Sequence, residues 1–144
     1  MRLINVNVNT QTYMSMFLLP KLLARSSRSA IINVSSVVAH KPYIMGILPV
    51  YCATKSYNWT LSEAMRESYS DKIDILTVTP ANTHTQMNPG IRVFSVTAVA
   101  HAVATINQLG WQKNTHGSIV HALHPRIDAI WPIGFIISKI NASR

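Results

Sequence analysis

Short β-branched runs alternate with helical patterns along this chain, and the alternation limits the folds that it can adopt. The runs at residues 30–35, 73–79 and 117–122 each predict a buried strand. Helical spacing of apolar residues predicts helices over residues 5–25, 50–70 and 95–109. Pro20 either kinks the first helix or marks a later start. Strands and helices in this order form parallel βαβ units, so we predict an α/β fold whose sheet is buried on both faces.

Such sheets bind ligands at the carboxyl ends of their strands, so we expect the chemistry to lie just after Val34 and Val78. Ser35 and Ser36 follow the first predicted strand. A hydroxyl there can donate a hydrogen bond to a substrate oxygen, although strand-end serines also occur without any such role.

Tyr51 and Lys55 stand four residues apart on a predicted helix and therefore share one face. A free tyrosine has a pKa of about 10, and a neighbouring ammonium lowers that pKa by favouring the phenolate. The phenol can then exchange a proton with a carbonyl or alcohol oxygen. The spacing alone recurs by chance, so a packed tyrosine beside a solvated lysine is the alternative interpretation.

Asn5, Asn7 and Asn9 alternate with valines near the start of the first predicted helix, where any of them could serve as a cap. The order N-V-N, I-I-N-V-S-S and Y-C-A-T-K-S resembles the short-chain dehydrogenase/reductase superfamily over nearly the whole chain. That family uses an Asn–Ser–Tyr–Lys tetrad, which matches Asn7, Ser36, Tyr51 and Lys55.

The resemblance implies a role for each member of this tetrad. Tyr51 would donate a proton to the substrate carbonyl, and Lys55 would lower the tyrosine pKa and hold the nicotinamide ribose. Ser36 would orient the carbonyl, and Asn7 would hold a water that links Lys55 to solvent. The spacings from Asn7 to Ser36 and from Ser36 to Tyr51 are longer than usual in the family, so Ser35 remains a candidate for the serine.

A second stretch, T-P-A-N-T-H-T at residues 79–85, falls where the family has a P-G-x-x-x-T loop that wraps the nicotinamide. The resemblance thus implies cofactor contacts by Pro80, Thr83 and Thr85, in addition to Tyr51 and Lys55. Ala81 replaces the family's glycine, so the resemblance does not fix the backbone conformation of this loop.

Within the family, the chain is most similar to the very-long-chain 3-oxoacyl-CoA reductases, the 17β-hydroxysteroid dehydrogenase type 12-like branch. The similarity rests on F-L-L-P at residues 17–20, A-I-I-N-V-S-S at 30–36 and G-S-I-V-H-A-L at 117–123. It implies reduction of a 3-oxoacyl-CoA or keto-steroid by NADPH, with NADH left open. It also implies that the protein is located at the endoplasmic reticulum membrane, on the cytoplasmic face, and it allows a homodimer.

The family's nucleotide-binding half begins with a T-G-x-x-x-G-x-G turn, whose glycines let a helix N-terminus approach the pyrophosphate. The five glycines of this chain lie too far apart to form that turn. We therefore expect residues 1–144 to form one partial domain, the C-terminal portion of a Rossmann-like doubly wound parallel sheet without the cofactor half. The alternative is a non-catalytic fragment or pseudoenzyme that acts as an interaction module.

The charge distribution bears on the class of partner. The net charge is +8, but the basic residues are scattered, which argues against nucleic acid and fits a polyanionic cofactor, an acyl-CoA or a membrane surface. The apolar run at residues 129–137 contains Pro132 and Gly134 and is too short to span a bilayer. Contact of the C-terminal tail with a membrane surface, or a basic membrane-surface module, is a further hypothesis.

Three further sequence features indicate no targeting segment, no metal site and no glycosylation. The N-terminus lacks the apolar stretch of a signal peptide, so we expect no targeting segment. His121 and His124 have no carboxylate or further cysteine arranged nearby, so we expect no metal site. Asn33 and Asn58 match the glycosylation pattern but lie in a predicted strand and a predicted helix, where the match is due to chance.

Overall fold

The central element is a parallel sheet in the order β1-β2-β5, seen in a computed structural model that describes residues 1–40, 49–86, 88–89 and 95–127. Strand β1 (Ser29–Val34) pairs with β2 (Ile73–Val78) along its whole length, and β2 pairs with the short β5 (Asn114–Thr115). A separate parallel pair joins β3 (Thr83–His84) to β4 (Val96–Thr97). The predicted α/β class with a parallel sheet is therefore confirmed.

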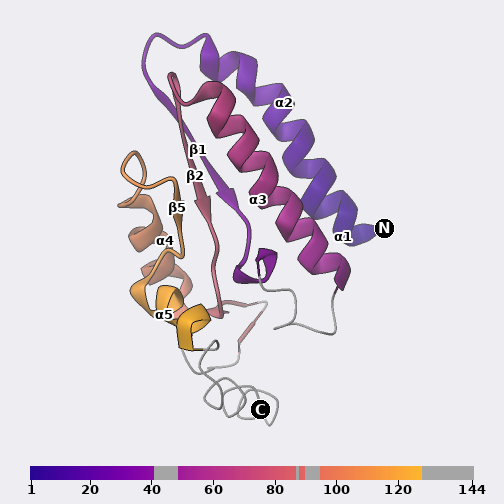
Figure 1. Ribbon diagram of the computed structural model, residues 1–144, viewed down its shortest axis with the longest axis vertical. Helices are drawn as coiled ribbons and strands as arrows, with labels where there is room; N and C mark the ends of the chain where they lie inside the picture. Colours follow the sequence, from indigo (N-terminus) through magenta and orange to yellow (C-terminus); the bar gives the residue numbers. More distant parts are fainter. Residues whose placement is uncertain (41–48, 87, 90–94, 128–144) are drawn as a thin grey trace.

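The two longest helical segments lie side by side along one side of this sheet (Figure 1). The first segment consists of α1 (Arg2–Ile4), a π-helical turn at Asn5–Asn9 and α2 (Thr10–Leu23). The second is α3 (Pro49–Tyr69). Pro20 neither ends α2 nor marks its start, because the helix runs from before Pro20 to Leu23.

Two shorter helices follow, α4 (Ala98–Ile106) and α5 (Ile119–Ile127). The N-terminus of α4 is capped by Thr97, whose hydroxyl accepts a hydrogen bond from the Ala100 N–H at 3.2 Å. The helix predicted over residues 95–109 is thus present in a shorter form. A strand at residues 73–79 and a helix at 50–70 are confirmed to within one residue at each end.

The apolar core lies between the helices and β2. Ile73 and Ile75 point toward α3 and pack with Met65, and leucines of α2 and α3 complete this cluster. Leu76 and Val78 are buried on the opposite face of β2, so the expectation of burial on both faces holds for this strand.

Strand β1 departs from that expectation. Its burial alternates, and Ile32 and Val34 are 36% and 53% exposed. The reason is its position at the edge of the sheet, where no described element covers its second face. The prediction of a sheet buried on both faces is therefore wrong for β1.

The strand predicted at residues 117–122 is also wrong. Pairing with β2 ends at Thr115, because Gly117 adopts a left-handed backbone with φ of 78°. A Cβ atom at this position would collide with the His101 ring and the Thr105 hydroxyl, so the turn requires glycine. Helix α5 then begins at Ile119, and the β-branched run becomes part of a helix.

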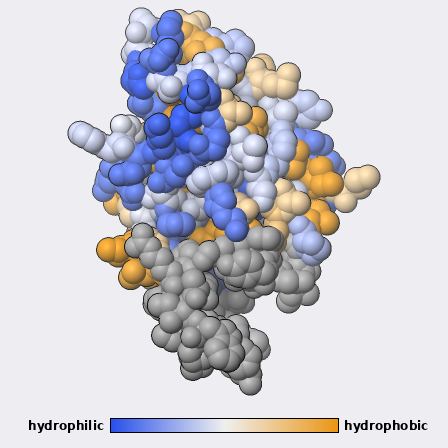
Figure 2. Space-filling view, viewed as in Figure 1, coloured by the Kyte–Doolittle hydropathy of each residue, from blue (hydrophilic) through white to orange (hydrophobic). Residues whose placement is uncertain are grey.

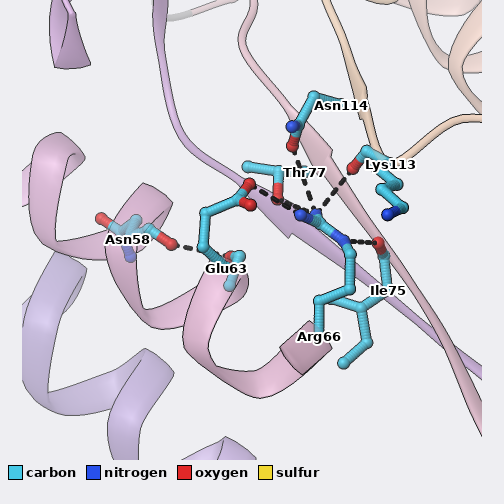
Figure 3. Close-up of polar contacts among 8 residues, drawn as sticks. Asn58, Glu63, Arg66, Ile75, Thr77, Lys113 and Asn114 are labelled. Atoms are coloured by element: carbon cyan, nitrogen blue, oxygen red, sulfur yellow. Dashed lines mark hydrogen bonds and ion pairs between the residues drawn. The ribbon is translucent and has the colours of Figure 1, made fainter. Parts of the chain in front are cut away.

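A buried guanidinium joins α3 to the two neighbouring strands (Figure 3). Arg66 is 7% exposed and comes from the last turns of α3. Its partners, at 2.7–3.2 Å, are the main-chain carbonyls of Ile75 and Lys113, the Thr77 hydroxyl, the Asn114 side-chain oxygen and the Glu63 carboxylate. The contact to Glu63 is an ion pair without hydrogen-bond geometry. This cluster fixes the short β5 at the edge of β2.

Part of the apolar surface remains uncovered on α2. Tyr13, Met14, Met16 and Phe17 are all exposed, and Figure 2 shows orange surface along the side where α2 runs. None of the described helices is long and apolar enough to cross a membrane. The apolar run at residues 129–137, on which the membrane-contact hypothesis rests, lies outside the described residues.

Candidate active site

Four segments meet at the carboxyl end of the sheet: the end of β1, the 3₁₀ turn at Val37–Ala39, the start of α3 and the π-helical turn (Figure 1). The 3₁₀ turn and the π-helical turn both contact α3. Parallel strands place their carboxyl ends on a common edge, so polar side chains from distant parts of the sequence gather there.

Tyr51 and Lys55 lie next to each other on α3, as their spacing predicts. The Lys55 Nζ is 5.9 Å from the centre of the Tyr51 ring. It donates a hydrogen bond to the Val34 carbonyl at 3.1 Å. Burial lowers the pKa of Lys55, because a desolvated ammonium is less stable than a hydrated one. The lysine is thus held between the tyrosine and the end of β1.

The two serines after β1 have different partners. The Ser35 hydroxyl donates to the Lys55 carbonyl at 2.7 Å and is 2% exposed, so it fastens β1 to α3. The Ser36 hydroxyl accepts a long contact from the Val38 N–H at 3.4 Å and caps the 3₁₀ turn. Within the described part of the chain, no hydrogen bond joins the Tyr51 hydroxyl to either serine. Tyr51 instead packs against the apolar cluster of Val37, Val38 and Cys52 that follows Ser36.

Asn7 lies inside the π-helical turn and faces α3. Its side-chain amide donates to the Thr54 hydroxyl at 3.0 Å, and that hydroxyl donates to the Tyr51 carbonyl at 2.8 Å. The Asn7 carbonyl accepts a hydrogen bond from the Asn58 side-chain amide at 2.8 Å. None of the three asparagines caps the helix with its side chain, so the capping interpretation is wrong. Wide π turns of this kind occur frequently at functional sites.

A hollow of about 250 Å³ opens beside Lys55, between the first helical segment and β1. Three of the residues that line it carry a buried polar atom that has no hydrogen-bond partner among the described residues: Gln11, Asn33 and Asn58. The Lys55 ammonium has three N–H donors and, among the described residues, one hydrogen-bond acceptor. The hollow can therefore accept a group rich in hydroxyl or carbonyl oxygens, or a cluster of waters.

The loop after β2 approaches the same edge. The Pro80 carbonyl accepts a hydrogen bond from the Val37 N–H at 3.2 Å, and Ala81 packs against the Val37–Val38–Cys52 cluster. The Thr83 hydroxyl makes a long contact of 3.4 Å with the Ala81 carbonyl. The Thr85 hydroxyl accepts from the Asn88 N–H at 3.1 Å, which closes a local turn. Pro80 thus touches the segment after Ser36, while Thr83 and Thr85 bond within their own loop.

Sequence reasoning missed Thr54 and Asn58 as parts of this site. Both are 3% exposed, although they are polar. They follow Tyr51 by three and seven residues, the spacing that places side chains on one face of a helix. The spacing could have indicated that Asn58 lies on the same helix face as Tyr51, although in the sequence alone Asn58 was considered only as a match to the glycosylation pattern. The side chains of Asn33 and Asn58 are both buried, in agreement with reading that match as chance.

His121 is fully buried and contacts the loop after β2, which the sequence did not indicate. In the part of the chain that the structure describes, no group of three or more histidines, cysteines, aspartates or glutamates is arranged to hold a metal ion.

The lowered pKa of Lys55 gives a direct prediction. We expect the pKa of Lys55 to be lower in the folded chain than in the same chain unfolded by urea, where the reference pKa of a lysine is 10.5. Because the folded pKa is the lower one, charged Lys55 disfavours folding at neutral pH, and this penalty shrinks as the pH rises toward 10.5. NMR titration of ¹³C-labelled lysine, with Lys55→Arg to assign the signal, measures both values. Equal values in the two states would contradict the desolvation.

Comparison with known proteins gives a consistent set of matches. A family model described as short chain dehydrogenase matches residues 1–96. The chain is 32% identical to a putative steroid dehydrogenase 4 of Caenorhabditis elegans, over 83% of this chain and 46% of that protein. It is 31% identical to the very-long-chain 3-oxoacyl-CoA reductase of Rattus norvegicus, over 91% of this chain and 42% of the relative. It is 30% identical to the Homo sapiens reductase of the same name, over 85% of this chain and 39% of that protein. The chain thus spans less than half the length of these curated relatives.

Proposed function

The chain belongs to the short-chain dehydrogenase family, and from this premise we propose that it carries the proton-transfer site of a carbonyl reductase that uses a nicotinamide cofactor. The observation that supports the proposal most directly is the Tyr51–Lys55 pair at the carboxyl end of the sheet, with Lys55 partly desolvated. Short-chain dehydrogenases use such a cofactor in general, and NADPH is our specific proposal.

Tyr51 is the proposed proton donor. Its hydroxyl has no hydrogen-bond partner among the described residues, so it is available to a substrate oxygen. The Lys55 ammonium lies beside the ring, 5.9 Å from its centre. The residue can therefore act as a general acid during reduction and as a general base in the reverse direction.

Ser36 is our choice for the serine that orients the carbonyl. The Ser35 hydroxyl is committed to the Lys55 carbonyl at 2.7 Å. Among the described residues, the Ser36 hydroxyl makes one long contact, which it accepts from its own turn, and its proton has no acceptor there. Ser36 also directly precedes the cluster on which Tyr51 packs.

The residues present fit the nicotinamide-ribose end of the cofactor. Lys55 lies beside the hollow and has N–H donors without an acceptor among the described residues, which suits the two hydroxyls of a ribose. Pro80, Thr83 and Thr85 are the proposed contacts from the loop after β2. The cofactor, when bound, supplies the hydride, while the protein orients and protonates.

Asn7 is the proposed link between Lys55 and solvent. The π-helical turn directs its main-chain carbonyl toward α3, where Asn58 already donates to it. The water proposed for this position has the Asn58 side-chain oxygen as an acceptor, because that oxygen has no hydrogen-bond partner among the described residues.

The substrate class follows from the names of the relatives. We propose a 3-oxoacyl-CoA, or a keto-steroid, because the matched relatives are named for these two substrate classes. The endoplasmic reticulum membrane, on its cytoplasmic face, is the proposed location. A homodimer, and contact of the C-terminal tail with the membrane surface, complete the proposal.

The test is turnover by the purified chain. We expect 3-hydroxyacyl-CoA to form from a 3-oxoacyl-CoA in the presence of NADPH, measured by mass spectrometry of the product. Parallel reactions with NADH and with a keto-steroid identify the cofactor and the substrate class. Absence of product from every combination, together with absence of cofactor binding by calorimetry, would rule out the activity for this chain.

A non-catalytic interaction module is the second candidate. The exposed apolar residues of α2 and the uncovered face of β1 favour it, because surfaces of this kind commonly contact another protein. This hypothesis predicts self-association or capture of a strand-donating partner, without cofactor binding. Sedimentation velocity over a range of concentrations distinguishes it, since a monodisperse monomer that turns over NADPH contradicts it.

A further inference from the structure

His121 contacts the main chain of the loop after β2 with both of its ring nitrogens. The Ala81 N–H donates to Nδ1 at 3.3 Å, and Nε2 lies 2.9 Å from the Asn82 carbonyl. A carbonyl needs a donor and an N–H needs an acceptor, so the neutral ring with its proton on Nε2 satisfies both contacts. The residue is 0% exposed, so water does not replace either contact.

Neighbouring groups support His121 on the side away from the loop. The His121 N–H donates to the Ser118 hydroxyl at 3.2 Å in the first turn of α5. The His101 ring lies 5.0 Å away, centre to centre, and its Nε2 contacts the His116 carbonyl at 3.0 Å. Gly117 leaves room for the His101 ring, because a Cβ atom there would collide with it, and the Gly117 carbonyl accepts a hydrogen bond from the Gln108 side chain at 2.9 Å. The ring therefore has little freedom to move away from the loop.

The opposite side of the same loop is attached to the proposed catalytic segment. Ser35 N–H donates to the Val78 carbonyl at 2.8 Å, and Val37 N–H donates to the Pro80 carbonyl at 3.2 Å. The backbone of residues 80–82 is thus held between the turn that follows Ser36 and the ring of His121. A shift of His121 would be transmitted to Ala81, which packs against the same cluster as Tyr51.

We propose that His121 is a positioning residue that fixes the backbone of Ala81 and Asn82 at the rim of the site. The inference rests on the proposed function, in which this loop contacts the nicotinamide end of the cofactor. Alanine stands at residue 81 where the family has glycine, and a specific hydrogen bond from its N–H to His121 fixes the backbone there.

Two single substitutions separate the two contacts of the ring. An asparagine oxygen can occupy the place of Nδ1, and a glutamine amide can reach the place of Nε2. His121→Asn therefore keeps the acceptor for Ala81, His121→Gln keeps the donor for Asn82, and His121→Leu keeps neither. His84→Leu is the control, because His84 is an exposed histidine on β3.

The readout is hydrogen exchange of the Ala81 amide by NMR, with the Ile75 amide in the core of β2 reporting on global folding. We expect His121→Leu and His121→Gln to accelerate Ala81 exchange by about tenfold, the effect of losing one hydrogen bond. His121→Asn should restore most of the protection, and His84→Leu should leave it unchanged. If Ala81 protection is the same in the Asn, Gln and Leu variants, the ring acts only as packing and the proposal is wrong.

A second measurement applies even if a variant does not fold. The ¹⁵N chemical shifts of the His121 ring in the unsubstituted chain should report the neutral tautomer with its proton on Nε2. A proton on Nδ1, or a charged ring at neutral pH, overturns the proposal. Should the tautomer and the exchange pattern hold while the chain neither binds nor oxidises NADPH, the positioning of the loop stands and only the proposed reductase activity falls.

Discussion

Replacing Tyr51 with phenylalanine is expected to lower kcat/KM for carbonyl reduction by about 10²- to 10⁴-fold, the usual contribution of a positioned general acid. The substitution removes only the hydroxyl, and the ring can keep its packing against Val37, Val38 and Cys52. The Tyr51 hydroxyl has no hydrogen-bond partner among the described residues, so folding stability should change by less than about 0.5 kcal/mol. Product formation from a 3-oxoacyl-CoA, measured under the conditions described above, is the readout.

Tyr13→Phe provides the matched control, because it removes the same atom from an exposed tyrosine on α2. We expect this control to retain full activity. If Tyr51→Phe reduces at the rate of the unsubstituted chain, Tyr51 is not the proton donor and the proposed mechanism is wrong. Equal losses in both variants would point to impurity or misfolding rather than to the site.

The largest expected effect on stability comes from Arg66→Met, which should lower the free energy of unfolding by about 3–5 kcal/mol, because each buried acceptor left without a donor costs about 1–3 kcal/mol. The substitution removes the donors for two main-chain carbonyls, the Thr77 hydroxyl and the Asn114 side chain. It also removes the ion-pair partner of Glu63, whose side chain is 42% exposed and can be hydrated instead. Domains are stable by only about 5–15 kcal/mol, so this single change would remove a large share of the total. Urea denaturation monitored by circular dichroism measures the difference.

Arg25→Met is the control for Arg66→Met, because Arg25 is exposed in the turn after α2. It should alter stability by no more than about 0.5 kcal/mol. Arg66→Lys should fall between the two, since a single ammonium can reach some of the acceptors but lacks the planar fork of arginine. A loss below about 1 kcal/mol for Arg66→Met would mean that water replaces the guanidinium, contrary to its burial in the structure.

The sequence predicted the fold well where its local patterns are strong. The helix at Pro49–Tyr69 follows from the helical spacing of its apolar residues, and the strands at Ser29–Val34 and Ile73–Val78 follow from short β-branched runs. The run at residues 117–122 misled this reading, because β-branched residues favour a strand until Gly117 turns the chain. Periodicity also cannot reveal that β1 lies at an edge, since that depends on which elements surround it.

For the site, the sequence predicted the proximity of Tyr51 and Lys55, because one helix fixes both residues. It could not distinguish Ser35 from Ser36, since the choice depends on which hydroxyl the backbone turns toward Lys55. The sequence suggested only a metal-binding role for His121, and that role was rejected. Its contacts in the loop after β2 are to main-chain atoms about forty residues away in the sequence. Contacts to main-chain atoms leave no trace in residue types, which is why they need coordinates.

The wide turn at Asn5–Asn9 holds one residue more per turn than the α-helices on either side of it. Deleting one residue within it would convert the turn to regular α-helix and leave Arg2–Ile4 close to their present direction, in contact with α3. The side chain of Asn7, which the wide turn presents to Thr54, would lose that contact. The fold should therefore tolerate a single-residue deletion in this turn better than one in α2, where every residue before the deletion would rotate by about 100°.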